Sequence, residues 1–188
     1  MKQVSFVFAT GTSWLDRLVT MVTNSPWSHV ALRFDSDNIL VEALAGTGFM
    51  IRAGEKYDDW PVSQTIRLQI SEVDYVNMLQ LSRRWEQDRI AYSYKTCILI
   101  GIKKVFGTLA ARACLHLFSG LDANRMVCSE MIVHLWRQAN PEFMSGQNPR
   151  LVSPDELYRV LIALAPPDFQ GTDFQDKIDK PGDCAYNC

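Results

Sequence analysis

One apolar run in the second half of the chain reads MVCSEMIVHLW at residues 126–136. Its apolar side chains, continued by Ala139, recur three or four residues apart, which is the spacing of one helical face. We therefore predict a helix that carries Cys128 in its first turn, on the buried face. The N-terminus of a helix has partial positive charge and unpaired N–H groups, which favour a thiolate and stabilise the oxyanion of a tetrahedral intermediate.

Cys128 by itself has a simpler interpretation. Free cysteine is among the most buried residue types and usually serves as a small core side chain. The residues that favour a reactive thiol lie far upstream, near the N-terminus.

Residues 27–44 predict a β-hairpin, because the apolar runs WSHVALRF and ILVEAL flank the polar turn DSDN. Pairing Phe34 with Ile39 places the most apolar side chains of both strands on one face. His29 and Glu42 then share the opposite face as diagonal neighbours, within reach of a carboxylate–imidazole contact. A slip of one residue would put them on opposite faces, and the apolar pattern disfavours that slip.

Composition indicates one ordinary globular domain. The chain has 188 residues, of which 47% are hydrophobic and 21% charged. We assign residues 1–165 to this domain and residues 166–188 to a tail rich in Asp, Pro and Gly. The net charge of -2 and the lack of a dominant basic patch give no footprint for nucleic-acid binding.

The five cysteines follow no zinc-finger spacing, and an odd count without a pattern fits a reducing compartment. The three histidines are scattered, so we predict no metal site and no cofactor. Residues 1–9 are interpreted as a strand and not as a signal peptide. The expected location is therefore the cytoplasm, unless a phage or a secretion system delivers the protein. The sequence leaves the oligomeric state open.

Helix starts are predicted at Ser13, Ser71 and Ser153, each followed three residues later by a carboxylate that completes a capping pattern. Strands are predicted at residues 4–8, 49–52 and 62–70. Residues 96–118 predict helix, broken near Gly107. The wider apolar region 96–121 is interrupted by cations and falls short of the ~20 residues that a membrane-spanning helix needs. It would either cover the core or lie against a membrane.

Cys128, His29 and Glu42 together match the logic of an activated thiol. A histidine takes the thiol proton and later returns it to the leaving group, while a third group orients the imidazole. Each residue also has a structural interpretation alone: His29 as a half-buried strand residue, and Glu42 as a surface partner of Arg33.

Four segments resemble circularly permuted NlpC-like papain-fold cysteine hydrolases. WSHVAL at residues 27–32 is similar to their histidine strand, and VEA at 41–43 to the strand that carries their third catalytic residue. VCSEMI at 127–132 is similar to their nucleophile helix, and LVSPDEL at 151–157 to a downstream helix. The order His, Glu, Cys is the permuted order. The resemblance covers residues 1–165 and points to the YiiX- and YebB-like subgroup, which is related to lecithin:retinol acyltransferase-like proteins. Val127 and Ser129-Glu130 differ from the residues that flank the cysteine in the acyltransferase branch, and the family's opening Gly-Asp pair is missing.

The resemblance implies an α+β, papain-like fold in which a small antiparallel sheet packs against the nucleophile helix. It implies Cys128 as nucleophile, His29 as general base and acid, and Glu42 as the orienting residue, with the Cys128 backbone N–H as first oxyanion donor. Further candidates for substrate binding or oxyanion support are Tyr92, Tyr94, Ser28 and Ser129.

The expected function is a cysteine peptidase or amidase that cleaves a cell-wall-type peptide or a small amino-acid conjugate through a covalent acyl-enzyme. Two alternatives stay open. One is a lipid esterase or acyltransferase with the same triad, which the apolar region 96–121 motivates. The other is a catalytically inactive binding module on the same fold.

Overall fold

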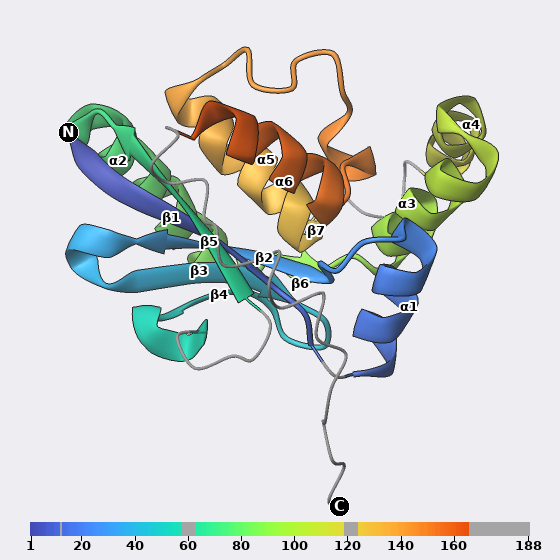
Figure 1. Cartoon of the computed structure of the whole chain (residues 1–188), viewed down its shortest axis with the longest axis horizontal. Helices are drawn as coiled ribbons and strands as arrows, with labels where there is room; N and C mark the ends of the chain where they lie inside the picture. The colour runs from blue at the N-terminus through green and yellow to red at the C-terminus, as the bar shows by residue number, and fades with distance from the viewer. Residues whose placement is uncertain (12, 58–62, 119–123, 166–188) are drawn as a thin grey trace, which may run out of the picture.

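The computed structural model describes residues 1–11, 13–57, 63–118 and 124–165 and shows an α+β fold (Figure 1). The predicted tail at 166–188 and the end of the apolar region at 119–121 lie outside the described residues. Five strands form one antiparallel sheet in the order β4-β3-β2-β1-β5. Their bounds are β1 Lys2–Ala9, β2 His29–Phe34, β3 Ile39–Leu44, β4 Gly48–Ala53 and β5 Ser63–Ile70.

The predicted hairpin register is confirmed. Phe34 pairs with Ile39 and Leu32 with Val41. The turn between the strands is a short 3-10 helix, Asp35–Asp37, closed by Asn38 in the left-handed conformation (φ 50°). An asparagine tolerates that conformation better than most residues, which explains why this polar turn fixes the register.

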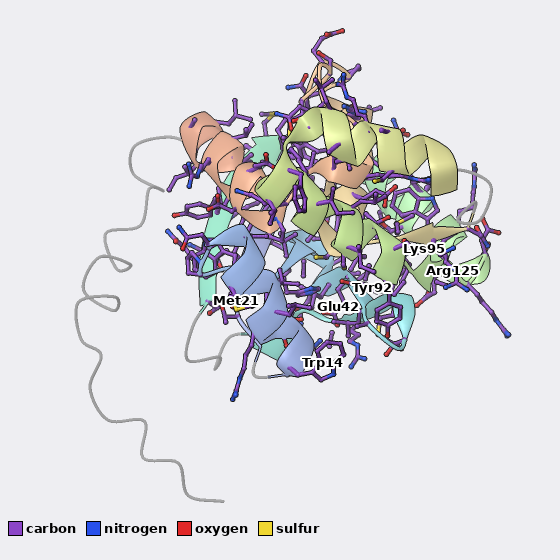
Figure 2. The ribbon with its side chains drawn as sticks, turned by 90° about the vertical axis from the view of Figure 1, so that its right-hand side faces the viewer. Trp14, Met21, Glu42, Tyr92, Lys95 and Arg125 are labelled. Atoms are coloured by element: carbon purple, nitrogen blue, oxygen red, sulfur yellow. The ribbon has the colours of Figure 1, made fainter. Side chains whose placement is uncertain are left out.

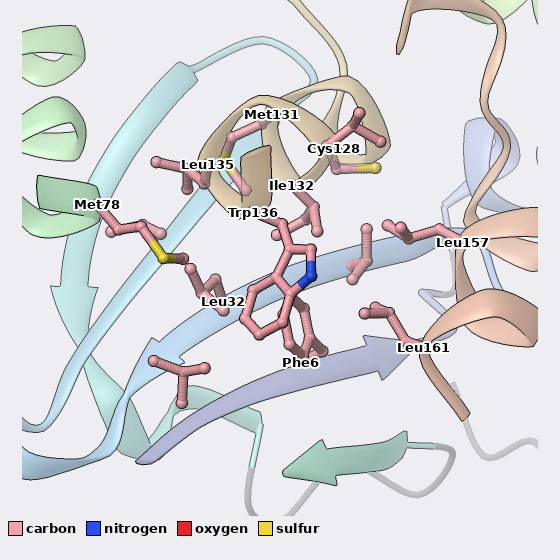
Figure 3. Packing of buried hydrophobic residues seen from close by; sticks show 14 of the residues in the cluster. Phe6, Leu32, Met78, Cys128, Met131, Ile132, Leu135, Trp136, Leu157 and Leu161 are labelled. Carbon is pink, nitrogen blue, oxygen red and sulfur yellow. The ribbon is translucent and has the colours of Figure 1, made fainter. Parts of the chain in front are cut away.

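Helix α5, Cys128–Ala139, lies across one face of the sheet and buries the predicted apolar stripe. In Figure 3, Met131, Ile132, Leu135 and Trp136 point from α5 towards Phe6 of β1 and Leu32 of β2. The rings of Trp136 and Phe6 pack edge to face with centroids 5.0 Å apart. Helices α2, Glu72–Gln87, and α6, Pro154–Leu164, flank α5 and close the main core.

The other face of the sheet carries a smaller apolar cluster. Val7, Ala31 and Leu40 pack there with Tyr57, which belongs to the 3-10 helix η2, Gly54–Tyr57. The Tyr57 side chain thus covers the face on which His29 and Glu42 were expected.

Three helices gather at one end of the sheet, on the right of Figure 1: α1 Trp14–Thr23, α3 Tyr94–Phe106 and α4 Thr108–Phe118. The predicted break at Gly107 is confirmed, and its φ of 87° is one that glycine adopts without strain. The helix begins at Tyr94 and not at Thr96, because the Ser93 hydroxyl caps it by accepting the Thr96 N–H at 3.2 Å.

The serine caps at Ser13, Ser71 and Ser153 each accept the predicted N–H three residues later. The sequence missed the short parallel pair β6, Ala91–Tyr92, and β7, Arg125–Met126, because two-residue strands carry no periodicity. In the described part of the chain, every helix is too short or too polar to cross a membrane.

Candidate active site

Cys128 is the first residue of α5, and three contacts fix the start of this helix. The Glu130 carboxylate accepts the Val127 N–H at 3.4 Å and pairs with Arg150 at 3.2 Å. The Ser129 hydroxyl donates to the Val152 carbonyl at 2.6 Å. The Cys128 thiol is therefore held at a rigid helix N-terminus, as the sequence predicted.

His29 begins β2, at a place where β2 and β3 part. The ladder between these strands runs from Phe34–Ile39 to Leu32–Val41, whereas β2 stays paired with β1 as far as His29–Ala9. His29 and Glu42 face each other beyond the end of the shared ladder, with His29 Nε2 3.3 Å from Glu42 Oε2. The Cys128 thiol lies close enough to the same imidazole that each group shifts the pKa of the other.

Glu42 is fully buried, and basic and hydroxyl groups surround its carboxylate. Tyr57 OH donates to Oε2 at 2.5 Å, Lys56 Nζ donates to Oε1 at 2.6 Å, and Arg52 Nε lies 3.2 Å from Oε1. A buried carboxylate is costly unless it is paired in this way. Glu42 is thus held in place by Arg52, Lys56 and Tyr57 as well as by His29. It is not a surface partner of Arg33, which pairs with Asp35 instead.

The electrostatics of the three groups favour a thiolate–imidazolium pair. Burial alone would lower the pKa of His29, but its hydrogen bonds with Cys128 and Glu42 outweigh burial and raise that pKa to about 9. Burial would likewise raise the pKa of the Cys128 thiol, but the hydrogen bond and charge of His29, with backbone hydrogen bonds at Val30 and Ser129, lower it.

Glu42 is the permanent anion of this group. Burial opposes its charge, yet hydrogen bonds from His29, Lys56 and Tyr57 lower the pKa of Glu42 to about 2. The carboxylate therefore stays ionised at neutral pH and supports the positive charge on His29.

A cavity of about 490 Å³ opens at Cys128 between α1 and α3. Trp14, Leu18 and Val19 of α1 face Ile98, Val105 and Phe106 of α3 across it. Its volume lies in the usual range of small-molecule sites, and such sites are mostly apolar with a few polar groups. Here the polar groups include the Cys128 thiol and the hydroxyls of Ser28 and Tyr92.

The four further candidates from the sequence all line this cavity, but their side chains differ in what they contact. Ser28 Oγ accepts the Gly11 N–H at 3.1 Å, and the Ser129 hydroxyl is committed to Val152. The Tyr92 hydroxyl contacts Cys97 Sγ at 3.2 Å, while Tyr94 is exposed, with its ring centroid 5.3 Å from that of Tyr92. Ser28 and Ser129 therefore have structural contacts, and the two tyrosines shape the cavity.

Sequence reasoning missed Arg52, Lys56 and Tyr57 around Glu42, and Cys97 in the cavity. No periodic pattern in the sequence marks a 3-10 turn that folds onto a sheet. The one available signal was the Lys-Tyr pair itself, two groups that donate to a carboxylate.

Metal ligands do not gather in the described ranges: no three His, Cys, Asp or Glu side chains there could hold an ion together. No protein-family model matches the chain, and no curated protein is similar to it in sequence.

Proposed function

We propose that this chain is a cysteine hydrolase of the permuted papain-like type, which forms a covalent acyl-enzyme on Cys128. The observation that carries this proposal is one buried imidazole that lies 3.3 Å from the Glu42 carboxylate and also interacts with the Cys128 thiol at the start of α5. The chain order His, Glu, Cys and the packing of α5 on an antiparallel sheet support the papain-like assignment.

The chemistry follows from the geometry. The Cys128 thiolate attacks the substrate carbonyl carbon, a C–S bond forms, and the carbonyl electron pair moves to oxygen. The oxyanion meets N–H groups of the first turn of α5, which have no acceptor within the helix. The tetrahedral intermediate collapses as protonated His29 gives its proton to the leaving group. Water, deprotonated by neutral His29, then attacks the thioester, and the thiolate leaves.

The cavity favours substrates with an apolar acyl group. A peptide substrate needs partners for its main-chain N–H and C=O groups, whereas the α1 and α3 walls offer mostly aliphatic and aromatic side chains. Between the predicted functions, this lining supports the lipid ester or acyl-transfer alternative. Cleavage of a peptide or amide bond, which would use the same triad, stays a prediction.

The test is to mix the protein with p-nitrophenyl acetate, butyrate and octanoate and with the matching p-nitroanilides. We expect p-nitrophenol release and an acyl adduct on Cys128, located by peptide mass spectrometry. Because each buried methylene contributes roughly 0.8 kcal/mol, octanoate should exceed acetate in kcat/KM by about tenfold or more. Cys114→Ser, a change on α4 outside the cavity, is the matched cysteine control.

Release of p-nitrophenol that persists in Cys128→Ala would contradict the proposed nucleophile. Folded protein that gives no adduct with any ester or anilide would favour the inactive binding module. Faster acylation by the anilides than by the esters would restore the amidase prediction.

A further inference from the structure

The helices that form the cavity also expose apolar side chains to solvent. Trp14 and Met21 on α1 are 74% and 72% exposed, and Phe106 and Leu109 around Gly107 are 73% and 83% exposed. The side of the molecule that carries these helices faces the viewer in Figure 2, where Trp14 and Met21 project from α1 below the α3–α4 hairpin. Large apolar side chains exposed on helices that contact one another, as α1, α3 and α4 do, mark a candidate interaction surface.

The hairpin is anchored so that this apolar face turns outward. Lys103 Nζ donates to Glu156 at 2.6 Å and to the Leu151 carbonyl at 2.9 Å, which ties one side of α3 to the start of α6. Ile98 and Val105 of α3 take no part in these contacts and are 63% and 66% exposed. We call the residues around the Gly107 break, Val105–Leu109, the elbow.

The charge of this surface is complementary to anionic headgroups. Helices α3 and α4 together contain four cations and no acidic residue. Lys103 and Lys104 pair with Glu156 and Asp155 of α6, so the cations of the surface are Lys95 and Arg112 from these helices and Arg17 from α1. The one carboxylate on α1, Asp16, is occupied in the capping box with Ser13. Cations beside exposed aromatic and aliphatic side chains are typical of segments that lie in the headgroup region of a membrane.

The apolar surface is continuous with the cavity. Trp14, Val105 and Phe106 are exposed and also line the cavity that leads to Cys128. A chain that leaves a bilayer at the elbow would therefore enter the cavity without crossing water.

We propose that α1 and the α3–α4 elbow form a docking surface for an anionic lipid bilayer, with Met21 and Leu109 inserted among the headgroups. Docking stands apart from the chemistry, whereas delivery of an acyl chain to Cys128 rests on the proposed hydrolase function. No spanning segment is needed, because the surface lies in the interface.

The test is co-sedimentation of the full chain with vesicles of phosphatidylglycerol and phosphatidylcholine, and with vesicles of phosphatidylcholine alone. We expect binding to the anionic vesicles that weakens with salt. Met21→Ser/Leu109→Ser should lower the partition coefficient by about tenfold or more, since it removes two exposed apolar anchors that lie outside the cavity. Val73→Ser/Val76→Ser, on exposed positions of α2, is the matched control and should bind like the wild type.

Cys128→Ala should also bind like the wild type, which separates the docking surface from the hydrolase proposal. Failure of the wild type to sediment, equal binding to neutral vesicles, or equal loss in both double variants would overturn the docking surface. So would a dimer in solution that Met21→Ser/Leu109→Ser dissociates, because a second copy would then cover this face. Circular dichroism of each variant verifies that it is folded.

Discussion

Two cysteines line the same cavity, yet their pKa values shift in opposite directions. The pKa of Cys128 is lowered, whereas that of Cys97 is raised to about 11. Burial acts in the same direction on both thiols. They differ in their partners: Cys128 meets the imidazole of His29, and Cys97 meets the neutral hydroxyl of Tyr92. The cavity alone therefore does not activate a thiol; a charged partner does, at a helix start whose dipole adds to its effect.

The largest expected effect is a contrast in alkylation rate at pH 7. With its pKa of about 11, Cys97 is a thiolate in about one molecule in 10,000 at this pH. Cys128 should therefore react with iodoacetamide more than about 100-fold faster. Timed labelling with peptide mass spectrometry measures both sites in one sample.

His29→Gln should remove this contrast, because it removes the positive charge that outweighs burial at Cys128. The variant's Cys128 should react about as slowly as Cys97. Equal rates of the two cysteines in the wild type, or a Cys128 rate unchanged in His29→Gln, would contradict the thiolate–imidazolium pair.

The next effect concerns Glu42→Gln and the stability of the fold. The folded pKa of Glu42, about 2, lies below the ordinary value of 4.5, so ionised Glu42 stabilises the fold above about pH 4.5. This contribution is lost as the pH falls towards 2. The shift corresponds to roughly 3 kcal/mol at neutral pH. Urea unfolding should show that loss in Glu42→Gln at pH 7 and a smaller difference from the wild type at pH 3.

Glu42→Gln should also affect Cys128, since the carboxylate helps to keep His29 protonated. The pKa of His29 should fall from about 9 towards 6.5. The upper pH limit of the thiolate–imidazolium pair should therefore be lower than in the wild type. Glu156→Gln is the matched control: it loses the ion pair with Lys103 but should leave Cys128 alkylation unchanged. A wild-type pH profile in Glu42→Gln would refute the orienting role of this carboxylate.

A smaller effect is expected from Tyr57→Phe, which removes the hydrogen bond to Glu42 Oε2. The expected loss of unfolding free energy is about 1.5–3 kcal/mol, as for hydrogen bonds to charged groups. The alkaline limb of the pH profile of Cys128 alkylation should shift slightly to lower pH, because a less firmly held Glu42 carboxylate stabilises protonated His29 less. Tyr75→Phe loses a comparable bond, to Asp37 at 2.7 Å, and should change stability without moving that limb. A Tyr75→Phe variant that moves the limb equally would show that the effect is general.

Much of the fold was predictable because its signals are local. Ser13, Ser71 and Ser153 cap helices through side chains that reach three residues ahead, and Gly107 breaks a helix through its own backbone. One polar turn fixed the hairpin register, and with it the contact between His29 and Glu42.

The unpredicted part of the site depends on distant segments. Strands β2 and β3 stop pairing beyond Leu32–Val41, and this opening gives Cys128 access to His29. No rule of strand pairing predicts where the two strands separate. The turn that holds Lys56 and Tyr57 against Glu42, and the placement of Cys97 beside Tyr92, bring together residues that share no periodic pattern. Such contacts are set by packing and not by local preference.

The smallest effect separates two roles for Tyr92. Its hydroxyl hydrogen-bonds Cys97 and lowers the pKa of that thiol against the larger effect of burial. Tyr92→Phe should therefore slow Cys97 alkylation at pH 10 by about threefold, which corresponds to a fraction of the free energy of one hydrogen bond. Cys128 alkylation at pH 7 should change less than that. Tyr94→Phe is the matched control, since its exposed ring packs against Tyr92. A tenfold loss of Cys128 acylation in Tyr92→Phe, with Tyr94→Phe unaffected, would instead indicate that the Tyr92 hydroxyl stabilises the oxyanion. A hydroxyl as well as a charged partner would then be needed to explain why Cys128 reacts and Cys97 does not.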